Sequence, residues 1–324
     1  MPCIPQCVHR TLRWLYSRPS AWFRHCCSRV PLPSDRPADA IDQYDLSWLS
    51  NDIGAFPDDH LEFLSIIKPG SAFTSVCSKA RLKDTGEIVA VHTRANRNRV
   101  EVGGDGSDWM PYVQREIRAL EAASDIKGVA KLKRAYHMGQ TSHLEFELLP
   151  GGSLTERMCL DEFGRSAVYE WEARQWMRPV VETYAQLLAK GLYHGDQQPA
   201  NIVFDAHGCP KLVDFELVQF FTPQKRLVRS GPNPTGVPFY MSREANTPNT
   251  VFDPEKATVY SLGQMLRMLL ELGHDPATRR LMQTYVRPLF SGPWRRDLSA
   301  DVMELIDSMT AGMVKTTRRP PHLT

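Results

Sequence analysis

Short runs of alternating apolar and polar residues fill the segment 63–93, and this period of two residues predicts β-strands. A Pro-Gly pair and an Asp-Thr-Gly triplet interrupt the runs, so we expect three antiparallel strands joined by turns. Two further strands are predicted at 129–139 and 141–152. Ahead of them, apolar residues over 107–123 recur every three or four positions, which predicts a helix. The pattern therefore indicates a small antiparallel sheet with one main helix.

Beyond residue 152 the apolar residues follow a helical period over longer stretches. The segments 170–191 and 257–273 predict helices, and short apolar runs at 201–204 and 210–215 predict strands between them. A Pro-Gly-Gly triplet marks the point where the two unlike halves meet. The predicted fold class is α+β, with a small antiparallel-sheet lobe and a larger, mainly helical lobe.

A proline-punctuated stretch before the first regular element sets a boundary near residue 40. We therefore expect three parts: a basic tail and linker over 1–40, the small lobe over 41–150, and the large lobe over 151–324. The sequence shows no internal repeat and no long low-complexity run that would change this division.

The composition is that of an ordinary globular protein and narrows the choice of partner. Lys and Arg number 39 against 37 Asp and Glu, so the net charge of +2 gives no broad footprint for nucleic acid. The sequence has no apolar stretch of the ~18 residues that a spanning helix needs. Outside the tail, the cysteines are scattered singly, which predicts a reducing compartment such as the cytoplasm.

The tail over residues 1–34 lacks Asp and Glu and interleaves arginines with aromatic residues. Such a stretch can lie on an anionic membrane surface, where the Cys26-Cys27 pair could accept acyl chains. A disordered basic tail is the simpler alternative, and a transit peptide is a third. The sequence thus predicts a cytoplasmic protein with an optional peripheral contact to a membrane.

Candidate chemistry lies in two loops of the large lobe. The stretch HGDQQPANIVF places Asp196 and Asn201 five positions apart before an apolar run, and LVDFE places Asp214 directly after another. A carboxylate can take a proton from a hydroxyl, and carboxylate and amide oxygens suit Mg²⁺. The alternative is that all three are ordinary loop-capping and turn residues.

In this order the landmarks resemble those of the eukaryotic-type protein kinase domain, over roughly residues 61–321. REIRAL resembles its small-lobe helix, LEFELLPGGSL its hinge, HGDQQPANIVF its catalytic loop and LVDFE its metal-binding segment. GVPFYMSREA, VYSLG and TTRRPP follow as later landmarks, the last of which implies an ion pair between Arg319 and Glu244. The resemblance implies transfer of phosphate from ATP, with Mg²⁺, to Ser or Thr hydroxyls of proteins. It makes Asp196 the base, and Asn201 and Asp214 the metal ligands.

The resemblance also implies a nucleotide site. Glu116 would hold the cation that orients ATP, and the hinge from Glu147 to Leu149, next to Phe146, would present backbone groups to adenine. The residues that the resemblance assigns to nucleotide binding are Gly70, Cys77, Lys79, Ala90, His92, Glu116, Glu147 and Leu149.

The nucleotide site departs from the family pattern at its cation. His92 stands where the third strand should carry Lys, and imidazole, with an ordinary pKa of about 6.5, is mostly neutral at pH 7. The with-no-lysine kinases draw a Lys from the neighbouring strand, and the best substitute here is Lys79, on the same face as Cys77. The alternative is an edge lysine in solvent.

Other supports are also altered. The glycine loop keeps Gly70 but has Ala72 and Ser75 at its other two glycine places, and Glu216 replaces the Gly of D-F-G. That Glu could be a further metal ligand or a charge that repels nucleotide. Polar links around the catalytic loop are expected to weaken, since Gln198 replaces the usual Lys, Val237 the Thr that bonds it, and Thr258 an Asp that braces the loop. Gly195 stands where many regulated kinases have Arg, so an Arg-mediated response to activation-loop phosphorylation is not expected. Thr222, Ser230 and Thr235 are candidates for modification.

Three functions remain open from the sequence. The first is a divergent, active Ser/Thr protein kinase, favoured by Asp196, Asn201 and Asp214. The second is a pseudokinase that acts as a nucleotide-binding or allosteric module on a protein partner, favoured by the altered supports. The third, a small-molecule phosphotransferase of the aminoglycoside or choline type, is disfavoured by GVPFYMSRE followed by YSLG, which predicts a shelf over 225–240 for an extended protein substrate.

Overall fold

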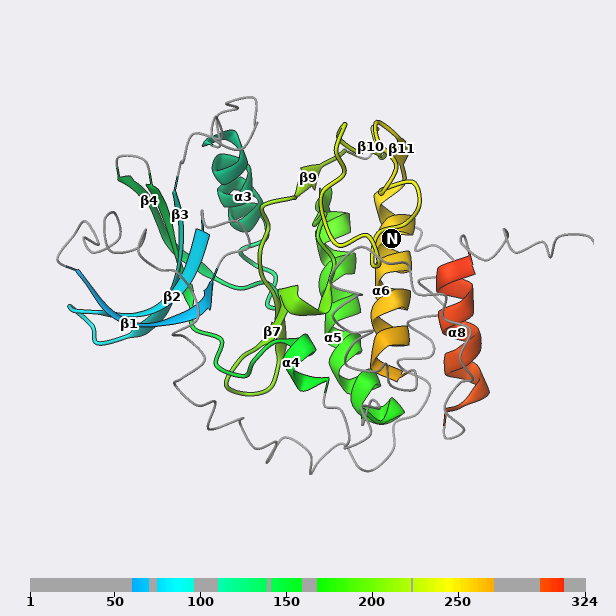
Figure 1. Ribbon diagram of the computed structural model, residues 1–324, viewed down its shortest axis with the longest axis horizontal. Helices are drawn as coiled ribbons and strands as arrows, with labels where there is room; N and C mark the ends of the chain where they lie inside the picture. Colours follow the sequence, from blue (N-terminus) through cyan, green and yellow to red (C-terminus); the bar gives the residue numbers. More distant parts are fainter. Residues whose placement is uncertain are drawn as a thin grey trace, which may run out of the picture.

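A computed structural model describes residues 60–69, 75–95, 110–138, 141–158, 168–222, 224–270 and 298–311 of the chain. These residues form a sheet, at the left in Figure 1, with one helix next to it and a larger group of helices to the right of both. The α+β fold with two unequal lobes is therefore confirmed.

The small lobe is built on one antiparallel sheet of five strands. Their order is β1-β2-β3-β5-β4, so each neighbouring pair except β3 and β5 is also adjacent in the chain order of strands. All five predicted strands are found, and their bounds are β1 Leu61–Pro69, β2 Ser75–Leu82, β3 Ile88–Ala95, β4 Leu132–Met138 and β5 Thr141–Glu147.

The register of this sheet decides which side chains point into the space between the lobes. Cys77 of β2 lies opposite His92 of β3, and His92 lies opposite Leu144 of β5. Because side chains alternate along a strand, His92 and Arg94 project from the same face of β3. Two residues of β3 are therefore candidates to reach the helix that packs nearby.

That helix, α3 (Met110–Ala122), is where the sequence predicted it. Its buried positions Val113, Glu116 and Leu120 recur at helical spacing, so they form one stripe toward the rest of the lobe. Glu116 is only 1% exposed although it carries a carboxyl group. A buried carboxylate in an apolar stripe needs a cation or a hydrogen-bond donor.

In its described residues, the large lobe contains two long helices, two shorter ones and several two- or three-residue strands. The helices are α4 Leu154–Arg157, α5 Glu170–Ala189, α6 Pro254–Leu270 and α8 Ala300–Thr310. The short elements are β6 Leu192–Tyr193, η4 Pro199–Asn201, β7 Ile202–Phe204, β8 Pro210–Leu212, β9 Gln219–Phe220, β10 Val228–Arg229 and β11 Val251–Phe252. Sequence patterns predicted α5, α6, β7 and β8 but not the others, because two-residue strands and single-turn helices carry too little periodicity.

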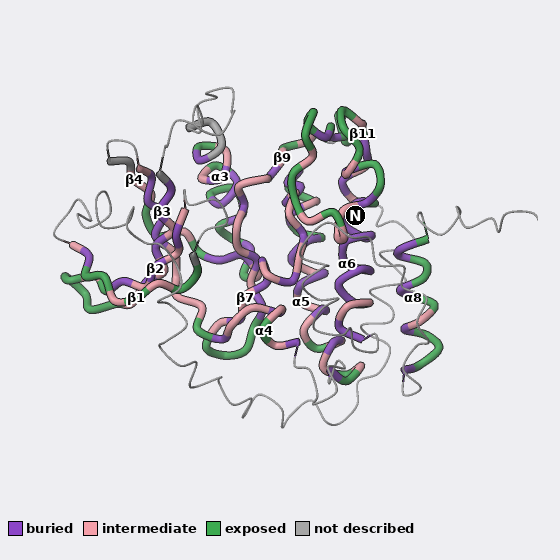
Figure 2. Tube along the Cα trace, in the orientation of Figure 1, coloured by how far each residue is buried: buried purple, intermediate pink, exposed green. Residues whose placement is uncertain are grey.

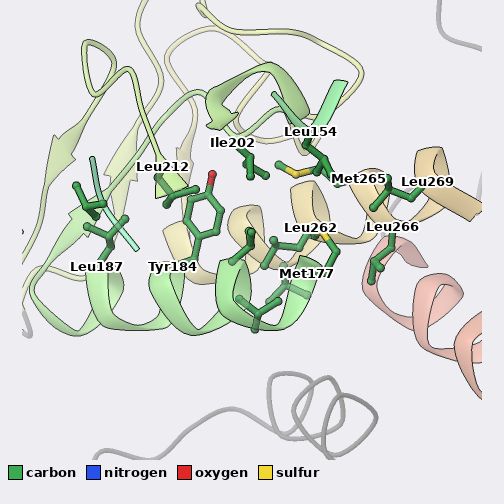
Figure 3. Close-up of a cluster of buried hydrophobic side chains, with 14 of the residues drawn as sticks. Leu154, Met177, Tyr184, Leu187, Ile202, Leu212, Leu262, Met265, Leu266 and Leu269 are labelled. Atoms are coloured by element: carbon green, nitrogen blue, oxygen red, sulfur yellow. The ribbon is translucent and has the colours of Figure 1, made fainter. Parts of the chain in front are cut away.

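The core of the large lobe lies between α5 and α6 (Figure 3). Met177, Tyr184 and Leu187 of α5 face Leu262 and Met265 of α6, and all five are buried. Figure 2 shows that α6 is buried along most of its length, whereas α8 keeps an exposed outer face. Since each fully buried large apolar side chain contributes about 1.5–3 kcal/mol, this pair of helices is a stable base for the loops above it.

The two lobes join where the sequence placed the Pro-Gly-Gly triplet. The backbone N–H of Gly151 donates to the carbonyl of Phe204 (2.8 Å), and the N–H of Phe204 donates to the carbonyl of Gly152 (2.9 Å). These bonds tie the end of the hinge to β7, which directly follows the Asp196–Asn201 loop.

Several predictions fall outside the described residues. They concern Gly70 of the glycine loop, the tail over 1–40 with its membrane contact, and Arg319 as the partner of Glu244. No bilayer-spanning helix is found in the part of the chain that the structure describes.

Candidate functional site

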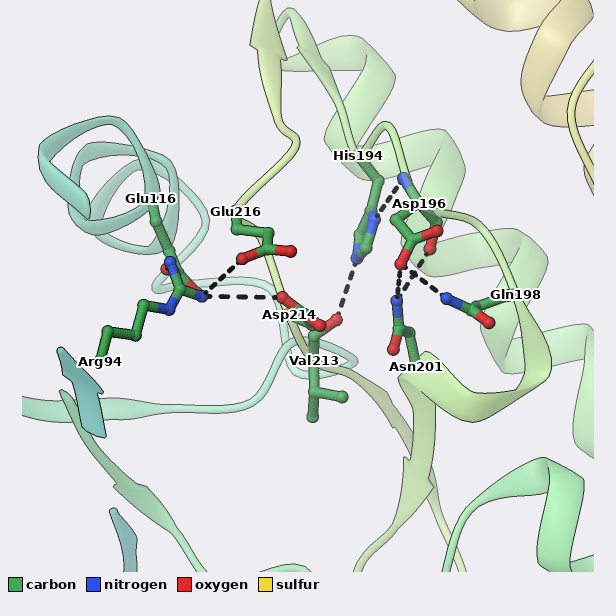
Figure 4. Close-up of polar contacts among 9 residues, drawn as sticks. All are labelled: Arg94, Glu116, His194, Asp196, Gln198, Asn201, Val213, Asp214 and Glu216. Atoms are coloured by element: carbon green, nitrogen blue, oxygen red, sulfur yellow. Dashed lines mark hydrogen bonds and ion pairs between the residues drawn. The ribbon is translucent and has the colours of Figure 1, made fainter. Parts of the chain in front are cut away.

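Two loops of the large lobe meet beneath the small lobe because short strand pairs join their ends. β6 pairs with β9 and β7 with β8, so the loop from β6 to β7 runs beside the segment that follows β8. The N–H of Val213 also donates to the carbonyl of Asn201 (3.0 Å). This pairing brings Asp196 and Asn201 next to Asp214 (Figure 4).

Asp196 and Asn201 are joined directly. The Nδ2 of Asn201 donates to the backbone carbonyl of Asp196 (3.0 Å) and to its Oδ2 (2.7 Å). Asn201 is 2% exposed, so its side chain is fixed in place. Because these bonds use only the amide nitrogen, the amide oxygen remains as an acceptor for a further group.

Gln198 takes part in this arrangement, contrary to the expectation that the polar link to Asp196 is lost. Its Nε2 donates to Oδ2 of Asp196 (2.7 Å). A neutral amide therefore stands where the family pattern has a Lys, and the Asp196 carboxylate accepts two amide hydrogen bonds. The link is kept in geometry, but without the positive charge.

Thr258 also keeps a connection to the catalytic loop, through Gln197, for which no role was predicted from the sequence. Its Oγ1 accepts from Nε2 of Gln197 (3.2 Å) and donates to the carbonyl of Pro254 (2.8 Å). Thr258 belongs to α6, so the loop is braced on the buried helix. The hydrogen bond from Gln197 partly offsets the expected weakening at this position.

His194 connects the two loops. Its Nε2 donates to the carbonyl of Val213 (3.1 Å), and its Nδ1 accepts from the N–H of Asp196 (3.3 Å). The ring centre lies 4.7 Å from that of Phe215, which is fully buried. Burial lowers the pKa of His194, so the neutral ring with its proton on Nε2 fits both bonds. No separate role for His194 was predicted from the sequence.

Asp214 has a strained backbone, with a φ of +66°. A residue other than Gly in the left-handed region costs energy, and such residues cluster at functional sites. Its Oδ1 is buried and makes no hydrogen bond within the described residues. A carboxylate oxygen held in this state is suited to a cation.

The cation beside Glu116 is Arg94. Its Nη1 lies 2.9 Å from Oε2 of Glu116, and its Nη2 lies 3.8 Å from Oδ1 of Asp214 and 3.3 Å from Oε2 of Glu216. Figure 4 shows the guanidinium between these three carboxylates. Arg94 follows His92 by two residues and so projects from the same face of β3, which is the signal that could have identified it.

Lys79, which was predicted from the sequence as the relocated cation, is not the residue that pairs with Glu116. It lies opposite Ala90 across β2 and β3, one residue pair further along that face than the pair of Cys77 and His92. No ion pair of Lys79 is found among the residues that the structure describes. Glu116 pairs with Arg94 of β3 instead.

Burial and the Arg94 charge set the protonation of the neighbouring groups. Burial raises the pKa of Glu116 to about 7, against the opposing effect of Arg94. Burial and then Arg94 lower the pKa of His92 to about 4, so His92 is neutral at pH 7. Burial also raises the pKa of Cys77 to about 11, which makes its thiol inert. Burial and the charge of Asp214 raise the pKa of Glu216.

The hinge residues adjoin this cleft. Glu147 uses its Oε1 to accept from Nζ of Lys211 (2.6 Å) and from the N–H of Lys131 (2.8 Å). Phe146 lies opposite Ala90, so the gatekeeper position and the third strand are adjacent. Leu149 is half-buried beyond them.

The three candidates for modification differ in access. Ser230 is 5% exposed, and its Oγ donates to the carbonyl of Thr247 (2.5 Å) and accepts from the N–H of Thr250 (2.9 Å). Its hydroxyl holds that segment together. Thr222 and Thr235 are exposed.

Gly195 shows why the Arg of the family pattern is missing. Its φ is +86°, and a Cβ built there would lie 2.1 Å from the carbonyl oxygen of Leu217. No side chain fits this backbone without movement. The segment after Asp214 therefore packs directly on the catalytic loop.

A sheet lobe hinged to a helical lobe, with an Asp–Asn loop, a strained Asp and a buried cation–carboxylate pair between them, defines the two-lobed, kinase-like class of protein. The sequence model of the protein kinase domain matches residues 66–320. The chain therefore belongs to the protein kinase domain family.

Curated relatives of the chain include plant kinases. It is 32% identical over 202 residues to calcium-dependent protein kinase 22 of Oryza sativa subsp. japonica, covering 61% of this chain and 32% of that protein. It is 25% identical to CBL-interacting protein kinase 19 of the same plant, over 71% of this chain and 44% of that protein. CBL-interacting serine/threonine-protein kinase 24 of Arabidopsis thaliana is 25% identical, over 59% and 40%. The chain thus spans less than half the length of these relatives.

Proposed function

We propose that the chain transfers the γ-phosphoryl group of ATP, with Mg²⁺, to Ser or Thr hydroxyls of proteins. The observation that carries the proposal is the convergence of Asp196, Asn201 and Asp214 below a buried Arg94–Glu116 pair. Phosphoryl transfer depends mainly on positioning and charge neutralisation, and these groups supply both. In this scheme Asp196 accepts the proton of the attacking hydroxyl.

The donor set fits a Mg²⁺ ion that arrives with nucleotide. Asp214 offers a buried carboxylate oxygen without a hydrogen bond, and Asn201 offers its amide oxygen. Among the described residues, no group of three His, Cys, Asp or Glu side chains could hold a metal by itself. Mg²⁺ commonly takes one or two protein oxygens and completes its shell with phosphates and water. Asn201 and Asp214 would hold it, and the ion would neutralise charge on the transferred phosphate.

Arg94 takes the part of the missing Lys in this proposal. A guanidinium stays charged at all accessible pH values and offers several donors in one plane, so one edge can face Glu116 while another faces a phosphate. His92 cannot do this, because its pKa of about 4 leaves it neutral. The Glu116 pairing orients Arg94 toward the cleft.

The acceptor in this proposal is a protein. The family match and the names of the relatives support Ser or Thr hydroxyls as the target. The segment 225–240 next to Asp196 has mostly exposed residues, which suits an extended substrate chain. A regulatory protein partner is part of the proposal as well, since two of the relatives are named for an interaction with CBL. The membrane contact of residues 1–34 stays a prediction.

A second candidate function is a pseudokinase that binds nucleotide or a partner protein without transfer. One observation favours it: the second edge of Arg94 already faces Glu216 and Asp214, at 3.3 Å and 3.8 Å. Such a site has less positive charge to offer ATP. Turnover decides between the two candidates.

The test measures transfer of labelled γ-phosphate from ATP to a degenerate Ser/Thr peptide library, with and without Mg²⁺. We expect Mg²⁺-dependent transfer by the full chain, reduced by about 10²-fold or more in Asp196→Asn because the proton acceptor is lost. Asp84→Asn is the matched control, since Asp84 lies in the exposed turn between β2 and β3 and accepts from the N–H of the next residue, Thr85 (2.8 Å). Binding of ATP without transfer by the unaltered chain would select the pseudokinase.

A further inference from the structure

One guanidinium faces three carboxylates at the junction of the lobes. Arg94 and Glu116 come from the small lobe, whereas Asp214 and Glu216 come from the segment after β8 in the large lobe. Figure 4 shows Arg94 reaching across to both of the latter. If all four groups are ionised, this cluster carries a net charge of −2, which opposes a further anion.

The two edges of the Arg94 guanidinium are held differently. Nη1 lies close to Glu116 (2.9 Å), while Nη2 is held only by longer contacts, 3.3 Å to Glu216 and 3.8 Å to Asp214. Arg94 is 9% exposed, and its Nη2 and Nε are buried without a hydrogen bond in the described part of the chain. Buried donors without acceptors are costly, so the Nη2 edge is suited to a stronger acceptor such as a phosphate oxygen.

Of the three carboxylates, Glu216 is the one that can leave. Its side chain is 45% exposed, compared with 30% for Asp214 and 1% for Glu116. An exposed side chain can rotate into water at little cost, whereas Glu116 would stay buried and Asp214 is fixed by its strained backbone. The contact of Glu216 with Nη2 is therefore the exchangeable one.

We propose that Glu216 is a built-in competitor of the nucleotide phosphates: it occupies the Nη2 edge of Arg94 in the free protein, and a bound phosphate replaces it. The inference rests on the proposed function, because it takes Arg94 as the cation that meets phosphate. Glu216 thereby sets how tightly the cleft holds a phosphorylated nucleotide. It leaves the binding of an uncharged nucleoside unaffected.

The test compares dissociation constants of fluorescent ATP and of adenosine for the full chain and for Glu216→Gln, with Mg²⁺ present. Gln keeps the size of the side chain and removes its charge. We expect ATP to bind about threefold to tenfold more tightly to the variant, a range reduced by the partial exposure of Glu216, and adenosine to bind equally to both. The same two dissociation constants are measured for Glu216→Ala, so that an effect specific to the Gln side chain can be recognised.

The matched control is Glu62→Gln. Glu62 pairs with Arg81 in the same lobe at 2.6 Å, and both side chains are exposed, so it removes the same kind of ion pair away from the cleft. We expect this variant to bind ATP like the unaltered chain. An equal gain in both variants would overturn the proposal, because a general change in charge would then explain it.

Three further results would overturn the proposal. Weaker ATP binding by Glu216→Gln would indicate that Glu216 is a metal ligand. Equal gains for ATP and adenosine would indicate that Glu216 hinders all ligands of the cleft. The absence of nucleotide binding by every variant would show that the site does not bind nucleotide phosphates. Failure of the proposed function is a separate result, since it is read from phosphate transfer by the unaltered chain. A tighter-binding Glu216→Gln in a chain without transfer would support the competitor and reject the enzyme.

Discussion

The cation of the cleft comes from an arginine two positions beyond the place where the family has its Lys. Strand alternation gives His92 and Arg94 the same face, but only the longer side chain pairs with Glu116. Burial, Arg94 and Lys68 keep His92 neutral, so Arg94 is the positive charge that pairs with Glu116. Replacing a Lys by a more distant Arg requires a longer reach and gives a planar, two-edged donor in return.

Arg94→Met is expected to reduce phosphate transfer by about 10²-fold, because it removes the charge aimed at the transferring phosphate. Lys79→Met is the matched control, since it removes a cation from the same sheet, and we expect less than about a twofold change, within the scatter of surface substitutions. Steady-state kcat/KM for ATP measures both. A larger loss in Lys79→Met than in Arg94→Met would restore the cation predicted from the sequence.

At the scale of elements, the position of the catalytic loop depends on how closely α6 packs against its neighbours. A Cβ built on Gly263 of α6 would lie 2.7 Å from Cβ of Met309 and 2.9 Å from Cγ2 of Thr310, both in α8. The same helix carries Thr258, which braces the catalytic loop through Gln197. The YSLG landmark therefore reflects close contact between two helices as well as anchoring of the loop.

Gly263→Val is expected to lower the free energy of unfolding by about 1–3 kcal/mol, because the added side chain overpacks the contact with α8. Lys256→Val introduces the same β-branched side chain at an exposed position of the same helix. It should cost less than about 0.7 kcal/mol, the usual range of helix propensity. Chemical denaturation measures both, and equal costs would show that the α6–α8 contact tolerates a larger residue.

At the scale of the whole molecule, the two lobes are linked by charge as well as by the hinge. Arg94 joins Glu116 of α3 to Glu216 and Asp214 of the large lobe, and the N–H of Phe215 donates to Glu116. Burial favours the protonated form of Glu116 more strongly than Arg94 favours the ionised form. Stability and lobe contact should therefore depend on pH near neutrality.

The raised pKa of Glu116 fixes the sign of that dependence. In the unfolded chain this carboxyl releases its proton near its ordinary pKa of 4.5, whereas in the folded chain it does so at about 7. Between these values the folded state holds more protons, so its contribution to stability is full below pH 4.5 and is lost as pH rises through 7. Glu116→Gln cannot titrate, so its stability relative to the unaltered chain should rise from pH 5 to pH 8. Denaturation midpoints across that range measure it, and parallel curves would contradict the assignment.

Much of the site could be predicted from local sequence. Asp196, Asn201 and Asp214 stand at landmark spacings beside apolar strands, and the structure brings the three together. The supports could not be predicted in the same way. Gln198 and Gln197 carry neutral amides, and whether such a side chain finds a partner depends on the loop and on α6, which are distant in sequence.

The sequence by itself determined the order of strands and helices and the positions of the acidic and amide groups, because strand alternation, helical period and turn residues act over a few neighbouring positions. Tertiary structure decided which cation meets Glu116, which carboxylate faces its free edge, and how the catalytic loop is braced. These depend on the register of β3 and on the approach of α3 and the large lobe, which place Arg94, and not Lys79, beside the buried Glu116.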